Sequence, residues 1–144
     1  MKKRILVFTA AFLVTITASF ANNTTPVPQS IVKQLNHEFQ NINNVEWKVT
    51  PDYYKASFTV AGNSLEAFFS YNGNLIAQSR KINIDQLPMS LIKEAKQKGF
   101  TNEMTELFEL LTERGTEYFI TFNTGKETKT YQSNGNGWNH YQSN

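Results

Sequence analysis

The 144-residue sequence contains no cysteine and only two histidines, His37 and His140. Without cysteine the chain forms no disulfide, offers no thiolate to a metal or a substrate, and has no residue for a lipid anchor. The histidines are far apart in the sequence, and neither belongs to a cluster with metal-ligand spacing. We therefore interpret both as solvated side chains and expect no metal and no cofactor.

Catalytic motifs are also missing from the sequence. It has no glycine-rich phosphate loop, no G-x-S-x-G and no H-E-x-x-H. One acidic run admits two interpretations, a Ca²⁺ site or acidic docking face on one hand and a solvated strand edge with its turn on the other. The spacing fits no EF-hand and no Asp takes part, which favours the second interpretation. The run consists of Glu103, Glu106, Glu109, Glu113 and Glu117. We expect a protein that is not an enzyme.

Residues 1–21 have the pattern of a signal peptide. Lys2, Lys3 and Arg4 precede an apolar stretch, and Ser19 and Ala21 supply the small residues of a cleavage site before Asn22. The apolar stretch is short and rich in threonine for a membrane span, and no later stretch is long enough for one. We expect export to the periplasm with no membrane insertion after cleavage.

The composition beyond the signal peptide limits the classes of partner. Three of the 14 basic residues lie in that peptide, so the rest of the chain carries slightly more acidic than basic side chains. This balance does not favour nucleic acid or anionic lipid as a partner. Eleven Phe, six Tyr and two Trp supply a hydrophobic core, on which a chain without disulfides depends.

The hydrophobic pattern predicts a helix followed by four strands, and then the same order again. Pro28 and Pro88 suit helix starts, and apolar residues recur on one helix face after each of them. Alternating apolar residues predict the strands, and Asn72-Gly73 predicts a type I′ hairpin. Asp85 is a candidate cap for the second helix, and Gly99 a residue that ends it. The expected strands begin near residues 45, 54, 65, 75, 103, 118, 127 and 138.

This order predicts an α+β fold of two tandem α-β4 repeats, with the helices packed on one face of antiparallel sheet. The two repeats either share one long sheet or dock side by side as two sheets. The prolines are 60 residues apart and the Asn-Gly-Asn triplets 62 apart. We place the signal peptide at 1–21, a flexible leader at 22–27, the first repeat at 28–83 and the second at 84–144. The expected core face holds Val45, Trp47, Tyr54, Phe58, Leu65, Phe69, Tyr118, Ile120 and Phe122.

Several segments of the first repeat resemble a known family of small exported bacterial proteins. The segments are a helix ending in Phe39, Asn44-Val45-Glu46-Trp47, Tyr53-Tyr54-Lys55-Ala56-Ser57-Phe58, Phe68-Phe69-Ser70-Tyr71-Asn72-Gly73-Asn74-Leu75 and Ile84-Asp85-Gln86-Leu87-Pro88. In these segments the chain is similar to PepSY-like, β-lactamase-inhibitor-protein-like proteins. The second repeat lacks an equivalent of Trp47. The resemblance implies the duplicated α-β4 fold and a periplasmic address, and it implies no catalytic motif.

A second set of apolar residues falls out of phase with the core residues on the same strands: Phe68, Ile76, Phe108, Leu110, Phe119 and Tyr131. If both helices cover one face of the sheet, this set lines the other. An aromatic patch on a sheet is typical of an interface, although packing between the two halves or strand twist can also account for it. We expect Phe68, Phe108, Phe119 and Tyr131 to form a binding surface, rimmed by Lys48, Lys55, Arg80 and Lys129.

The sequence thus favours a non-enzymatic periplasmic binding or inhibitor-like module. Its uncovered sheet face would engage an envelope protein or peptide. The alternative is a carrier of a small apolar ligand, held between two curved half-sheets. A hydrolase is the third and weakest hypothesis, because the sequence offers no catalytic constellation.

Overall fold

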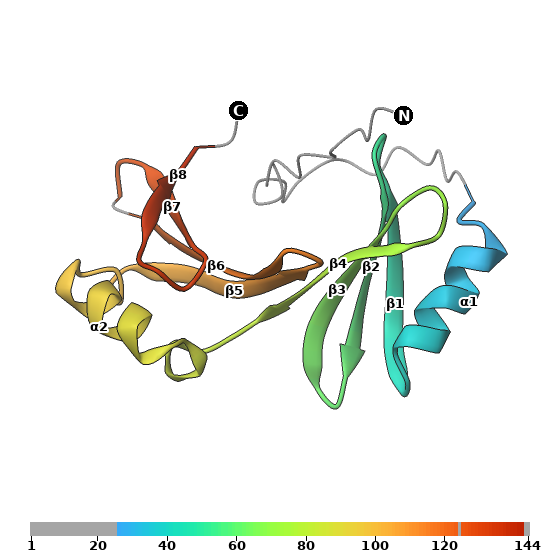
Figure 1. The fold of residues 1–144 in the computed structure, drawn as a ribbon, viewed down its shortest axis with the longest axis horizontal. Helices are drawn as coiled ribbons and strands as arrows, with labels where there is room; N and C mark the ends of the chain where they lie inside the picture. Colours follow the sequence, from blue (N-terminus) through green and yellow to red (C-terminus); the bar gives the residue numbers. More distant parts are fainter. Residues whose placement is uncertain (1–25, 124, 143–144) are drawn as a thin grey trace.

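Eight antiparallel strands pair in chain order in a single sheet, and two helices lie on one side of it (Figure 1). The computed structural model describes residues 26–123 and 125–142, so the expected signal peptide lies outside the described residues. The elements are α1 (Gln29–Glu38), β1 (Ile42–Val49), β2 (Tyr54–Val60), β3 (Asn63–Phe69), β4 (Leu75–Lys81), the short 3₁₀ helix η1 (Ile84–Gln86), α2 (Met89–Gln97), β5 (Met104–Thr112), β6 (Gly115–Asn123), β7 (Thr128–Ser133) and β8 (Asn139–Tyr141). The expected α+β class and order of elements are confirmed.

Both helices begin directly after a proline and bury one face. The N-cap residues are Pro28 and Pro88, so Asp85 does not cap α2 but lies in η1. The α2 helix ends at a left-handed glycine, as expected: Gly99 has φ 73°. Phe100 N donates to Ala95 O at 2.9 Å and Gly99 N donates to Lys96 O at 3.1 Å. This pair of bonds is the Schellman arrangement, which satisfies carbonyls at a helix end.

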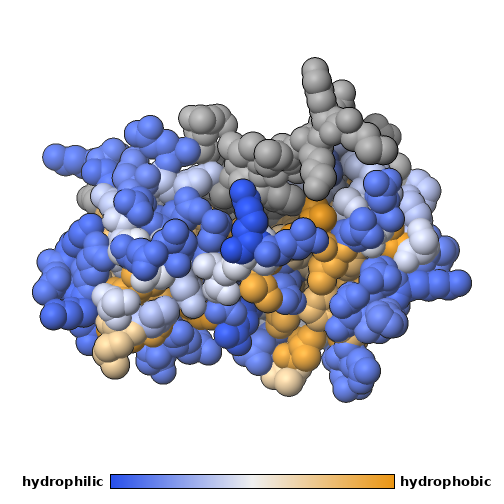
Figure 2. Space-filling model, viewed as in Figure 1, coloured by the Kyte–Doolittle hydropathy of each residue, from blue (hydrophilic) through white to orange (hydrophobic). Residues whose placement is uncertain are grey.

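The two helices cover the same face of the sheet at its two ends. Ile31 and Leu35 of α1 are 1% exposed and pack with apolar residues of β2 and β3. Leu91 and Ala95 of α2 are fully buried and pack with apolar residues of β5 and β6. Figure 1 shows the sheet curving away from the helices, so that the helix-free side is concave. In Figure 2, hydrophilic residues cover most of this view, and hydrophobic residues gather mainly over the first half.

Most of the expected core residues lie on the helix-covered face, but Val45 does not belong to the core. The pairing of β1 with β2 shifts between Asn43 and Glu46, and Asn44 has φ 53°. Such a bulge breaks the alternation of side chains, which leaves Val45 37% exposed. Trp47 lies on the helix-covered face as expected, opposite Ala56. It is half-buried and packs against the cluster of buried residues that contains Ile31 and Leu35 of α1.

The type I′ hairpin lies at Ala61-Gly62 and not at Asn72-Gly73. Val60 pairs with Asn63 across a two-residue loop, and both loop residues have positive φ, 48° and 81°. At the expected position only Gly73 is left-handed, with φ 85°. Gly73 N donates to Ser70 O at 2.9 Å, which makes a three-residue loop of the common kind that closes with a left-handed glycine.

Candidate functional site

The concave face of the sheet is the candidate site, because neither helix covers it. Strand pairing identifies its residues, since directly paired residues point to the same side. Lys55 pairs with Phe68, Phe68 with Ala77, and Lys81 with Phe108, which pairs in turn with Phe119. The concave face therefore includes Lys48, Lys55, Ser57, Glu66, Phe68, Ser79, Lys81, Glu106, Phe108, Leu110, Glu117, Phe119, Thr121, Gln132 and Tyr141.

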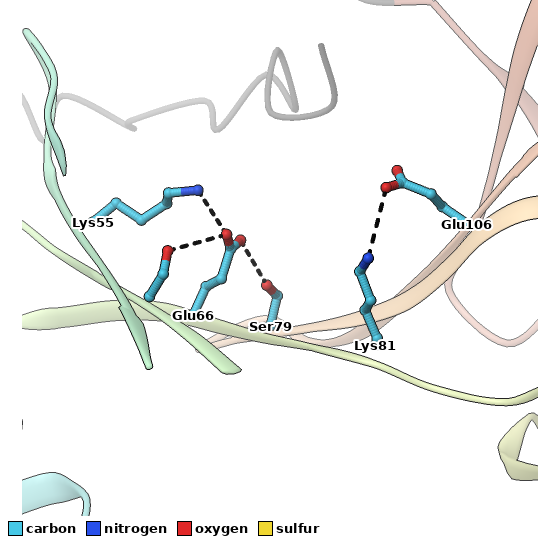
Figure 3. Close-up of polar contacts among 6 residues, drawn as sticks. Lys55, Glu66, Ser79, Lys81 and Glu106 are labelled. Carbon is cyan, nitrogen blue, oxygen red and sulfur yellow. Dashed lines mark hydrogen bonds and ion pairs between the residues drawn. The ribbon is translucent and has the colours of Figure 1, made fainter. Parts of the chain in front are cut away.

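A polar network centred on Glu66 occupies the first half of the concave face. Lys55 Nζ lies 2.6 Å from Glu66 Oε1. Ser57 Oγ donates to the same oxygen at 3.4 Å, and Ser79 Oγ donates to Oε2 at 3.3 Å. Figure 3 shows these side chains rising from three adjacent strands toward one carboxylate. The carboxylate thus has partners on both oxygens, and it holds the lysine in place.

A second charge pair crosses the boundary between the two halves of the sheet. Lys81 Nζ of β4 lies 4.0 Å from Glu106 Oε1 of β5, on the concave face (Figure 3). On the helix-covered face of the same two strands, Arg80 binds Glu109. The hydrogen bond from Arg80 to Glu109, followed by the negative charge of Glu109, raises the pKa of Arg80. The acidic run is therefore divided between the two faces and is partly neutralised. The expected strand edge is wrong, because β5 lies between β4 and β6, although Glu113 is exposed in the turn that follows β5. Within residues 26–123 and 125–142 no group of acidic and histidine side chains could hold a metal.

Aromatic rings flank the polar centre on the concave face. Phe68 meets Tyr53 edge-on, with ring centroids 5.6 Å apart. Phe108 stacks on Phe119 at 4.9 Å with an interplanar angle of 8°, and Tyr141 meets Phe119 edge-on at 5.7 Å. The structure thus brings Phe108 and Phe119 together in the second half and places Phe68 in the first.

These rings are less accessible than an open patch requires. Phe68 and Phe119 are 1% and 0% exposed, whereas Phe108 and Tyr141 are half-buried. The expectation of an exposed patch is therefore wrong for the two buried rings. Phe108 and Tyr141 keep part of their surface accessible on this face.

Tyr131 lies on the helix-covered face, contrary to expectation. It pairs with Ile120 and packs against the cluster of buried residues that contains Leu91 and Ala95 of α2. Its ring also contacts that of Phe100, with centroids 4.5 Å apart. The alternation along β7 was misread, because the strand begins at Thr128, and Thr130 and Gln132 point to the concave side. Arg80 and Lys129 are also on the helix-covered face, because Arg80 pairs with Leu65 and Lys129 with Phe122. Lys48 and Lys55 are on the concave face.

Two tyrosines at this face were missed in the sequence. Burial raises the pKa of the Tyr53 hydroxyl, although a hydrogen bond with Thr50 opposes the change. Burial, followed by the nearby Glu117 carboxylate, raises the pKa of Tyr141. Both hydroxyls therefore stay protonated at neutral pH and can donate hydrogen bonds. Tyr53 lies in a turn and Tyr141 in a three-residue strand, where alternation is too short to assign a face.

Comparisons with known proteins give a likeness of fold. No family model matches the chain, and neither does any curated protein. Among solved structures, a BLIP-like protein from Bacteroides fragilis is 24% identical, with a TM-score of 0.68 over 85% of this chain and 91% of that one. This chain shares its fold with a BLIP-like protein. The β-lactamase-inhibitor-protein-like resemblance is thus confirmed at the level of fold, while nothing bears out the PepSY-like name.

Two further structures have the same fold at lower identity. A DUF2874 family protein from Bacteroides uniformis is 14% identical, with a TM-score of 0.66 over 74% of this chain and 80% of that one. A candidate periplasmic protein from Bacteroides eggerthii is also 14% identical, with a TM-score of 0.66 over 74% and 79% of the two chains. In the described part of this chain, neither helix is long and apolar enough to cross a membrane.

Proposed function

We propose that this protein is a non-enzymatic periplasmic binding or inhibitor-like module that engages an envelope protein or peptide through its concave face. The observation that carries the proposal is the composition of that face. It combines stacked aromatic rings with a polar centre held in place by Glu66. Interfaces typically pair aromatic anchors with satisfied polar groups.

The comparisons support the same class of function. The BLIP-like likeness fits an inhibitor-like module, and the candidate periplasmic neighbour fits the export that residues 1–21 predict. Within the binding surface we assign direct contact to Phe108 and place Phe68 and Phe119 as the packed layer that supports it. Tyr131 has no part in this surface, because it packs on the α2 side.

The test compares two substitutions on one strand. Phe108 and Leu111 both lie in β5 but face opposite sides, and Leu111 is 41% exposed on the helix-covered side. We expect Phe108→Ala to lose most of the partner in quantitative recovery from the periplasm of the native host, and Leu111→Ala to retain it. Circular dichroism and urea unfolding check that both variants are folded. Equal recovery of the partner by both variants would overturn the assignment of the concave face.

We also propose that the fold consists of two tandem α-β4 repeats, at 28–83 and 84–144, after a signal peptide at 1–21 and a leader at 22–27. The two helical anchors support this division, because Ile31 and Leu91 are buried at equivalent places 60 residues apart. Each repeat has its own cluster of buried residues. Superposition of the two ranges should match Ile31 with Leu91 and β1–β4 with β5–β8; a match in a different strand order would contradict the duplication. Sequencing the N-terminus of the periplasmic protein tests the start at Asn22.

A further inference from the structure

Three Asn-Gly pairs occur in the chain, at Asn72-Gly73, Asn134-Gly135 and Asn136-Gly137. Such a pair can cyclise, because glycine has no side chain to hinder the approach of its amide nitrogen to the carbonyl carbon of the asparagine side chain. The attack requires that this nitrogen be free. A nitrogen whose N–H donates a hydrogen bond must first lose that bond.

The structure distinguishes the three pairs by this criterion. Gly73 N donates to Ser70 O at 2.9 Å, and Gly135 N donates to Ser133 Oγ at 3.0 Å. Gly137 N, by contrast, donates no hydrogen bond within residues 26–123 and 125–142. Both Asn134 and Asn136 are exposed, but Asn134 Oδ1 accepts a hydrogen bond from Asn136 N at 3.4 Å, which restrains that side chain.

We propose that Asn136-Gly137 is a site of spontaneous deamidation. The amide nitrogen of Gly137 gives up its proton and attacks Cγ of Asn136. A new C–N bond forms, the bond from Cγ to Nδ2 breaks, and ammonia leaves with the proton. One water molecule then opens the five-membered succinimide at either carbonyl and yields aspartate or isoaspartate. The sequence of steps consumes one water and needs no oxidant or reductant.

Deamidation here would affect the packing of the next residue, Trp138. This side chain is buried, and its Nε1 donates to Leu91 O of α2, so we call it the Trp138 anchor. A Cβ built on Gly137 would lie 3.1 Å from Glu94 Oε2, and Trp138 N donates to both Glu94 oxygens at 3.3 Å. Deamidation places a second negative charge beside Glu94, and isoaspartate also adds one methylene to the main chain. Both changes should weaken the contacts of Trp138 with α2.

The rate of deamidation at each pair tests the proposal. The folded protein is incubated at mildly alkaline pH, digested with trypsin, and each asparagine is followed by fragmentation mass spectrometry, with electron-transfer fragmentation to detect isoaspartate. We expect Asn136 to convert several-fold to about tenfold faster than Asn72 and Asn134, since one hydrogen bond contributes about 0.5–1.5 kcal/mol. In urea the three rates should converge. The proposal would be overturned if Asn136 deamidated no faster than Asn72 and Asn134, or if the three rates kept the same ranking in urea.

Two variants sharpen the test. Ser133→Ala removes the acceptor of Gly135 N and should accelerate conversion of Asn134, with Asn72 as the unchanged internal reference. An unchanged Asn134 rate would show that the hydrogen bond is not the protecting element. For the consequence, Asn136→Asp should lower the urea midpoint at neutral pH relative to Asn136→Gln, and Glu94→Gln should remove that difference. A difference that persists in Glu94→Gln would contradict the effect on the Trp138 anchor.

Discussion

At the scale of single residues, left-handed backbone marks the points where the strands bend or turn. Besides glycines, the described residues with positive φ are Asn41, Asn44 and Ala61. Asparagine tolerates this conformation because its side chain bonds locally, whereas the Cβ of alanine meets the neighbouring carbonyl oxygen. Ala61, at φ 48°, is therefore the one strained non-glycine position of these three.

We predict that Ala61→Asn stabilises the fold. The loop already has type I′ geometry, in which Asn-Gly is the favoured pair, and relief of the strain should contribute about 1 kcal/mol. Ala61→Val should have the opposite effect, because a β-branched residue is strongly disfavoured at positive φ. Urea midpoints of the three proteins check the order Asn above Ala above Val. A midpoint for Ala61→Asn below that of the wild type would contradict it.

At the scale of helices and strands, regular segments could be predicted from the sequence and irregular ones could not. Alternation identified β2, and Gly99 identified the end of α2, because these features depend on local residues alone. Residues 107–111 of β5 also fit a helix by propensity, and their place in the repeat is what predicted a strand. The bulge beside Val45 depends on how β1 pairs with β2, and the face of Tyr131 depends on where β7 begins. Pairing between distant segments has no local signature, so these positions were misassigned.

The anchor of the C-terminal segment is the clearest example of a contact between distant elements. Trp138 is 4% exposed, and its Nε1 donates to Leu91 O of α2 at 3.1 Å. The sequence indicated only a short strand here. The second half of the sheet thus has its own buried tryptophan, at a place unrelated to that of Trp47.

We predict that Trp138→Ala destabilises the protein more than Trp47→Ala does. Truncation of a fully buried aromatic side chain typically costs about 3–5 kcal/mol, and Trp47 is only half-buried. Trp138→Phe should cost less, about 1 kcal/mol, because it retains a ring and removes one hydrogen bond. Free energies of urea unfolding give the comparison. Equal costs for the two alanine variants would show that Trp138 is not the stronger anchor.

Glu94 makes this anchor sensitive to pH. The hydrogen bond from Lys98 Nζ at 2.8 Å, followed by that from Trp138 N, lowers the pKa of the Glu94 carboxyl, although partial burial opposes the change. A lowered pKa in the folded protein means that the stabilisation is present above the ordinary pKa of Glu and is lost as pH falls through the folded value. Glu94→Gln should therefore lose less stability than the wild type between neutral pH and about pH 3. Urea midpoints at both pH values measure this, and parallel losses would refute it.

At the scale of the whole molecule, two separate clusters of buried residues share one continuous sheet. The strands β4 and β5 join the halves through paired residues from Ala77 with Thr112 to Lys81 with Phe108, and Ile82 N donates to Leu107 O at 3.0 Å beyond them. The sequence left open whether the halves share a sheet. That they do is what makes the concave face continuous, so that Glu66 and Phe108 belong to one surface.

This continuity predicts that the two halves unfold together. Trp47 packs in the cluster of the first half and Trp138 in that of the second, so Trp47→Phe leaves a single tryptophan that reports the second half alone. Its fluorescence and the far-ultraviolet circular dichroism of the whole sheet should then give the same midpoint and slope in urea, as a two-state transition requires. If the two halves were held together only weakly at β4 and β5, the second half would unfold at its own urea concentration and the two curves would separate. Breaking the charge pairs on both sides of that boundary, with Lys81→Ala and Arg80→Ala together, should lower the common midpoint without separating the curves, because the main-chain pairing remains.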